Sequence, residues 1–122
     1  IFDGYIGYAK ELLDGVKDVK ITSRLKESAA VLVGDEFSAS PHIEEMMKKM
    51  GQPVPERESV LEINPDNSLV KQAQTLFEKN KDDDKAKDLT HLIHEQAIIA
   101  SGAKLKDPSL FINRLNKLLS KN

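Results

Sequence analysis

The amino-acid sequence predicts an α+β domain in which a small three-stranded sheet is flanked by helices. Two observations predict this fold class. Five segments repeat apolar residues at the 3.6-residue period of a helix, and three short runs are rich in the β-branched residues typical of strands. Capping residues, prolines and glycines separate these segments and place the turns. The expected strands cover residues 17–25, 29–33 and 59–63.

The N-terminal part is expected to form one helix followed by two paired strands. Apolar positions within residues 2–13 recur at helical spacing, and Gly15 is a natural end for that helix. The strand that follows could run to Leu25, and residues 30–33 form a short apolar run. Because the two runs are neighbours in the sequence, they predict a hairpin-like pair.

A short helix is expected from Pro41, with Ser40 as its cap and Gly51 as its stop. One face of this helix carries apolar side chains at positions i, i+3, i+4 and i+7, namely Ile43, Met46, Met47 and Met50. Methionine is flexible and polarizable, so this methionine face suits a surface that must fit many apolar partners. Periodicity alone favours the other interpretation, in which the face packs on the core of the domain.

The third strand is expected to lead directly into a third helix. Residues 60–63 alternate as a strand does, and Asn64 and Pro65 are a cap and a proline suited to a first helical turn. The helix then places one apolar stripe toward the core, made of Leu69, Val70, Ala73, Leu76 and Phe77. The charged run that follows is expected to be a solvated turn. Three acidic residues there lie favourably near the N-terminus of the next helix: Asp82, Asp83 and Asp84.

Two helices are expected in the last third of the chain, and they carry more apolar surface than one small domain needs. The first has a stripe roughly 160° wide, with Ile98 on its far side and with these members: Ala86, Leu89, Leu92, Ile93, Ala97, Ile99 and Ala100. The second has one broad apolar side, with Leu110 well off it, formed by Phe111, Ile112, Leu115, Leu118 and Leu119. Helices that are apolar on more than one side predict contact with another chain.

The composition excludes several classes of function. The formal net charge is −2 with 31% charged residues, so the chain has no basic field that would hold a nucleic acid. It contains no cysteine, which excludes disulfides and thiolate metal sites. No run approaches the roughly 18 apolar residues of a membrane span. We therefore expect neither nucleic acid nor membrane as a partner.

Three residues that are close in sequence, His91, His94 and Glu95, suggest a metal site, but they lack the His-Glu-x-x-His spacing of zinc proteases. A solvent-exposed histidine pair is the simpler interpretation. The aspartates of residues 82–88 lack the glycine and glutamate of a calcium loop, and no phosphate-binding or nucleophile motif is present. We therefore expect no catalytic, cofactor or metal site. A small metal-dependent enzyme using those three residues is the rival interpretation.

Four segments form an ordered series along the chain: Val-Lys-Ile-Thr-Ser-Arg-Leu at 19–25, Leu-Glu-Ile-Asn-Pro-Asp at 61–66, Ala-Ile-Ile-Ala-Ser-Gly at 97–102 and Asp-Pro-Ser-Leu-Phe-Ile-Asn-Arg-Leu at 107–115. Each is weak alone, but their order and spacing are specific. From about residue 5 to residue 119, the chain resembles the C-terminal domain of the heat-shock protein 90 chaperones, most closely the bacterial form. One departure is Ala29, where many members have proline.

The resemblance implies a constitutive homodimerisation module. In the family, the last two helices of each protomer pack into a four-helix bundle, which implies a dimer interface of Ala97, Ile98, Phe111, Leu115, Leu118 and Leu119. The family also has an amphipathic helix that offers apolar residues to client proteins. The methionine face of Ile43, Met46, Met47 and Met50 falls at the matching place. The resemblance therefore shifts the expectation for this face from core packing to exposure.

The resemblance also implies that residues 1–122 are one domain of a longer chaperone, whose N-terminal ATPase and middle domains lie outside this sequence. ATP and magnesium are then expected for the whole protein and no cofactor for this domain. The expected partners are a second copy and unfolded or partly folded clients, in the bacterial cytoplasm. Because the chain lacks a Met-Glu-Glu-Val-Asp tail, tetratricopeptide co-chaperones are not expected. A free-standing dimeric adaptor without an ATPase is the alternative.

Overall fold

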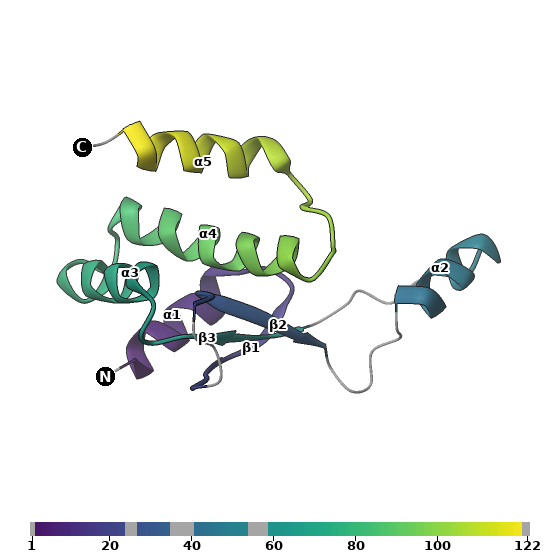
Figure 1. Cartoon of the computed structure of the whole chain (residues 1–122), viewed down its shortest axis with the longest axis horizontal. Coiled ribbons are helices and arrows are strands. Elements are labelled where there is room, and N and C mark those ends of the chain that lie inside the picture. The colour runs from purple at the N-terminus through teal and green to yellow at the C-terminus, as the bar shows by residue number, and fades with distance from the viewer. Residues whose placement is uncertain (1, 24–26, 35–40, 54–58, 121–122) are drawn as a thin grey trace.

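The computed structural model describes residues 2–23, 27–34, 41–53 and 59–120 of the chain. Its elements (Figure 1) follow in the order α1 (Asp3–Leu12), β1 (Val16–Ile21), β2 (Ala30–Gly34), α2 (Pro41–Lys49), β3 (Ser59–Ile63), α3 (Ser68–Lys79), α4 (Asp84–Ala100) and α5 (Pro108–Ser120). The predicted α+β fold with a three-stranded sheet is confirmed.

The strand order is β1-β3-β2, with β1 parallel and β2 antiparallel to β3. The predicted hairpin of β1 and β2 is therefore wrong, because β3 lies between them. Leu61 and Ile63 of β3 are each 1% exposed, and Leu61 stands opposite Val19 on one side and Leu32 on the other. The strand with the most deeply buried side chains thus takes the centre. β1 ends at Ile21, and the predicted extension to Leu25 lies outside the described residues.

The core lies between the sheet and α1, α3 and α4, which all lie on one side of the sheet (Figure 1). A buried hydrogen bond ties α1 to α4. The Tyr5 hydroxyl donates to Thr90 Oγ1 at 2.8 Å, because the Thr90 hydroxyl itself donates to the Ala86 carbonyl at 2.8 Å. Burial raises the pKa of Tyr5 to about 12, so its hydroxyl stays protonated. This network ties α1 to the first half of α4, the helix that α5 contacts.

The start of α3 differs from the prediction by three residues. Asn67, not Asn64, is the cap, and its side chain accepts a hydrogen bond from the Leu69 amide at 2.9 Å. Asn64 is instead used in the preceding turn. Its side chain accepts from the Asp66 amide at 3.0 Å and donates to the Ser28 carbonyl at 3.1 Å. The end of β3 is thus tied to the segment before β2.

Candidate functional site

α5 runs back along α4 from the loop that joins them (Figure 1). Gly102, with φ +87°, follows the end of α4 in the left-handed conformation that suits a helix stop. None of the residues of α5 is buried. Its side toward α4 is formed by the half-buried side chains of Phe111, Arg114 and Leu118. α5 is therefore attached along one side and open along the rest.

The open part of α5 contains an apolar ridge. Ile112, Leu115 and Leu119 are 52%, 37% and 70% exposed, and their i, i+3, i+7 spacing places them along one line of the helix. We call these three residues the α5 ridge. Leu110, at the start of the helix, is a further exposed apolar side chain at 48%. Exposed leucines occur singly on many proteins, but a continuous line of them is typical of an interaction surface.

The residues of the predicted dimer interface fall into three environments. Ala97 is 2% exposed and belongs to the core of the domain. Ile98, Phe111 and Leu118 are half-buried, and Leu115 and Leu119 are exposed. The structure adds an exposed residue at the end of α4, Ile99, which is 49% exposed and belonged to the predicted apolar stripe but not to the predicted interface. It also adds Ile112, which the predicted broad apolar side contained but the predicted interface omitted.

Aspartate side chains accept hydrogen bonds from backbone amides at the start of α4 and at the start of α5. Asp83 caps α4, as its predicted position at the helix N-terminus suggested, by accepting from the Ala86 amide at 2.8 Å. Asp107 accepts from the Leu110 amide at 3.2 Å in the first turn of α5. Between these ends, Glu95 forms an ion pair with Arg114, and Asp88 forms one with Lys117.

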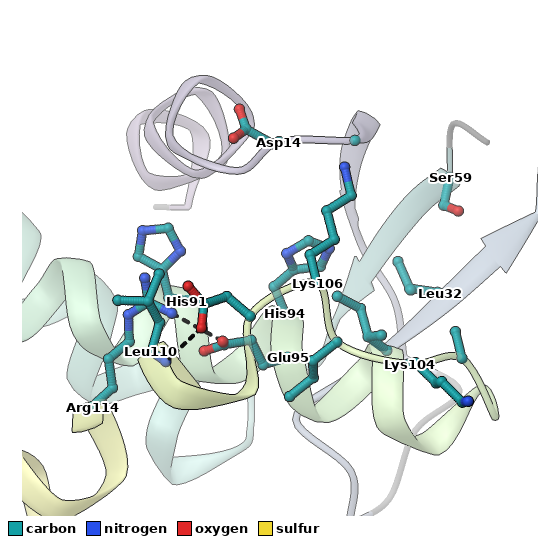
Figure 2. Close-up of a pocket in the computed structure, with 15 residues that line it drawn as sticks. Asp14, Leu32, Ser59, His91, His94, Glu95, Lys104, Lys106, Leu110 and Arg114 are labelled. Carbon is teal, nitrogen blue, oxygen red and sulfur yellow. Dashed lines mark hydrogen bonds and ion pairs between the residues drawn. The ribbon is translucent and has the colours of Figure 1, made fainter. Parts of the chain in front are cut away.

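A cavity of about 460 Å³ lies between α4, the α4–α5 loop, the first half of α5 and the turn before β1, with one residue each from β2 and β3 (Figure 2). His91 and His94 line it and are half-buried. The predicted solvent-exposed histidine pair is therefore wrong, because the loop before α5 covers this side of α4. Burial lowers the pKa of both histidines, that of His94 to about 4. Both imidazoles are thus neutral at physiological pH.

Glu95 does not join the histidines as a ligand, because its Oε2 accepts a hydrogen bond from Arg114 Nη1 at 2.9 Å. Burial raises the pKa of this carboxyl, and the Arg114 guanidinium opposes that rise. Within the described ranges, no group of three or more metal-ligating side chains is found. None of the helices in these ranges is long and apolar enough to cross a membrane.

α2 lies apart from the sheet and the other helices (Figure 1). On its methionine face, Ile43, Met46 and Met50 are 49%, 50% and 68% exposed, and Met47 is half-buried. None of the side chains described for α2 is buried. Within the described residues the methionine face therefore contributes nothing to the buried core.

Comparison with known proteins identifies the family. The model of the Hsp90 protein family matches residues 5–122. The chain belongs to the Hsp90 protein family. Chaperone protein HtpG of Magnetococcus marinus is 46% identical over 111 residues, which are 91% of this chain and 17% of that relative. Chaperone protein HtpG of Vesicomyosocius okutanii is 39% identical over 120 residues, which are 98% of this chain and 18% of the relative.

Psychrobacter arcticus has a further chaperone protein HtpG that is 43% identical over 88% of this chain. The chain spans less than a fifth of the length of these HtpG relatives. The resemblance to heat-shock protein 90 chaperones in the sequence is therefore confirmed at the level of the family.

Proposed function

We propose that this chain is the homodimerisation domain of an HtpG chaperone and that α4 and α5 form the dimer surface. The single observation that supports this most is that α5 has no buried residue although apolar side chains line it on two sides. A helix of this kind buries little of its apolar surface against its own protomer. A second copy that covers the α5 ridge would supply the missing burial.

The energy available from such an interface is large enough for a stable dimer. Each large apolar side chain contributes roughly 1.5–3 kcal/mol when it is fully buried. A two-fold axis doubles every contact, so the three ridge residues contribute six side chains. In the proposed dimer, α4 and α5 of both protomers form a four-helix bundle. Its interface would bury about 1,200–2,000 Å² of accessible surface in total, the size of a standard protein–protein interface.

In the whole chaperone, the role of this domain is mechanical. The dimer interface, called the seam below, raises the effective concentration of the two distant ATPase domains for each other. Contact between the ATPase domains of the two protomers then becomes an intramolecular step. ATP and magnesium bind to the ATPase domain, and this domain carries no catalytic residue or cofactor. We place the protein in the bacterial cytoplasm, where its partners are a second copy and client proteins.

We further propose that the methionine face of α2 contacts clients. Exposures of 49%, 50% and 68% at Ile43, Met46 and Met50 support this role. Unfolded and partly folded proteins present apolar segments of varied shape. Methionine side chains have three rotatable bonds and a polarizable sulfur, so they adapt to such segments better than branched side chains do.

The dimer proposal is tested by the oligomeric state of the chain. Analytical ultracentrifugation at micromolar concentration should find a dimer for the natural sequence. Leu115→Asp places two carboxylates in the seam and should give a monomer, because buried charges without partners are strongly destabilising. Asn113→Asp, which adds the same charge at an exposed position on the other side of the helix from Leu115 and Leu119, is the matched control and should remain dimeric. A dimer that persists in Leu115→Asp contradicts the assignment of the surface.

A further inference from the structure

Two ion pairs join α5 to α4. Arg114 Nη1 lies 2.9 Å from Glu95 Oε2, and Lys117 Nζ lies 3.1 Å from Asp88 Oδ2. The Arg114 and Glu95 side chains are only 19% and 11% exposed, whereas Lys117 is 50% exposed and Asp88 is 16% exposed. The acid nearer the start of α4 pairs with the base nearer the end of α5, which is the order that antiparallel helices require.

These ion pairs matter because the apolar packing between the helices is incomplete. No residue of α5 is buried, and Phe111 and Leu118 on its inner side are only half-buried. Apolar contacts are non-directional, so a small rotation or shift of α5 would cost little of their energy. A short ion pair between poorly hydrated side chains has a defined geometry and is lost by such a shift. The rotation and register of α5 on α4 therefore depend on the charged pairs.

We propose that Glu95 and Arg114, assisted by Asp88 and Lys117, are positioning residues for dimerisation. They hold α5 in the rotation and register at which the α5 ridge faces a second copy of this chain. The inference rests on the proposed function, because it names the residues that present the proposed dimer surface. It does not place these four residues in the seam itself.

The surroundings of Glu95 indicate that this pair contributes geometry more than stability. Glu95 is 8% exposed, and its Oε1 accepts no hydrogen bond from the part of the chain that is described. Burial is the largest influence on the pKa of its carboxyl and raises it, with a further rise from Asp107, while Arg114 lowers it. Burial and Asp107 together thus disfavour the carboxylate more than Arg114 stabilises it. Buried pairs of this kind can often be replaced by apolar residues without loss of stability.

Charge reversal in the 122-residue chain tests the proposal. Glu95→Arg or Arg114→Glu alone puts like charges in contact and should weaken the dimer at least about tenfold in sedimentation equilibrium. The double reversal restores an attractive pair and should return the dissociation constant to within about threefold of the natural value. Single reversals that dimerise as tightly as the natural chain would overturn the proposal, as would a double reversal no tighter than the singles.

The matched control is the Lys10–Asp18 pair, which is longer, at 3.9 Å, and lies away from α5 with side chains 53% and 40% exposed. Its reversal, Lys10→Glu with Asp18→Lys, should leave the dimer within about twofold of the natural affinity, because exposed pairs contribute little. A loss equal to that of the Glu95 and Arg114 variants would show a general charge effect and overturn the specific role.

An apolar replacement separates positioning from stability and remains informative if a single reversal fails to fold. Glu95→Leu with Arg114→Met should weaken the dimer about tenfold, because only the more exposed Asp88–Lys117 pair then sets the register of α5. In the monomeric Leu115→Asp background, the same pair should leave the midpoint of thermal unfolding unchanged or raised. If this double variant dimerises with natural affinity, the proposal is overturned. It is also overturned if the double variant lowers the stability of the protomer as well as the affinity of the dimer. A natural chain that is itself monomeric contradicts the proposed function instead.

Discussion

α2 and α5 both carry an exposed line of large apolar side chains, but the domain holds the two helices differently. α5 lies along α4 and is joined to it by ion pairs at 2.9 Å and 3.1 Å. α2 lies apart from the other helices, and its methionine face projects from a helix with no buried side chain described. An apolar face fixed on a rigid neighbour suits one partner of defined shape. A flexible face held apart suits many partners.

The side chains of the two faces agree with this difference. The α5 ridge consists of Ile112, Leu115 and Leu119, whose branched side chains have few rotamers and pack well in a fixed seam. The face of α2 uses three methionines, which fit irregular surfaces. The comparison therefore supports the proposal of a permanent interface on α5 and a transient one on α2, and four experiments can break or sharpen it.

The largest effect is expected from the α5 ridge. Ile112→Gln, Leu115→Gln and Leu119→Gln together remove six apolar side chains from a two-fold seam, and the dimer dissociation constant should rise at least about a thousandfold. Glutamine is a good helix former, so α5 itself should persist. Sedimentation velocity measures the change. Asn113→Gln with Asn116→Gln, on exposed positions of the same helix, should leave the dimer intact.

The second-largest effect is expected from the methionine face of α2. Met46→Gln, Met47→Gln and Met50→Gln should reduce the suppression of aggregation of a heat-unfolded model protein several-fold, while the midpoint of thermal unfolding changes by less than about 2 °C. The control replaces polar residues of the same helix by glutamine: Glu45→Gln, Lys48→Gln and Lys49→Gln. If the methionine variant instead melts many degrees lower, the face packs on folded structure and the contrast with α5 fails.

A smaller effect is expected from pH. His94 is neutral in the folded domain because burial lowers its pKa to about 4, below the ordinary value of 6.5. Its contribution to stability is therefore full above pH 6.5 and is lost as the pH falls toward 4. After allowance for solvent screening, His94→Gln should remove on the order of 1–2 kcal/mol of that pH dependence.

Urea unfolding at pH 7 and at pH 4.5 measures this difference. If His94→Gln leaves the difference in stability between the two pH values as it is in the natural chain, the α4 side of the cavity does not disfavour the charged imidazole.

The smallest effect is expected at the start of α5. Asp107→Ala removes the carboxylate that accepts from the Leu110 amide at 3.2 Å and should lower the free energy of unfolding by about 0.5–1 kcal/mol. Urea titration of the Leu115→Asp monomer measures it without the contribution of dimerisation. Asp82→Ala, at an exposed turn position, is the comparison variant and should change the free energy by less than about 0.5 kcal/mol.

Much of the fold could be predicted because the signals are local. Helix periodicity located α1, α2, α4 and α5, and glycines marked three of their ends at Gly15, Gly51 and Gly102, all of which have positive φ. The start of α3 could not be predicted as well, because Asn64 and Asn67 are equally good caps. The choice between them depended on the Ser28 carbonyl, 36 residues away from Asn64 in the sequence.

The candidate surfaces could be predicted in part. Apolar spacing found the helices that carry them, but it misplaced individual residues. Ala97 and Ile99 both belonged to the predicted stripe of α4, yet Ala97 is 2% exposed and Ile99 is 49% exposed. The half-burial of His91 and His94 was also missed, because part of the lining of their cavity, including Asp14, Leu32 and Ser59, is remote from them in the sequence. A helical wheel cannot show where a neighbouring element ends.

The sequence by itself determined which segments are helices or strands, which faces of them are apolar, and the family to which the chain belongs. These properties depend on residues three or four positions apart, or on motifs in a fixed order. Only the tertiary structure decided that β3 separates β1 from β2, that Arg114 pairs with Glu95, and that α5 turns its ridge outward. Each of these depends on contacts between residues distant in sequence, which no local pattern contains.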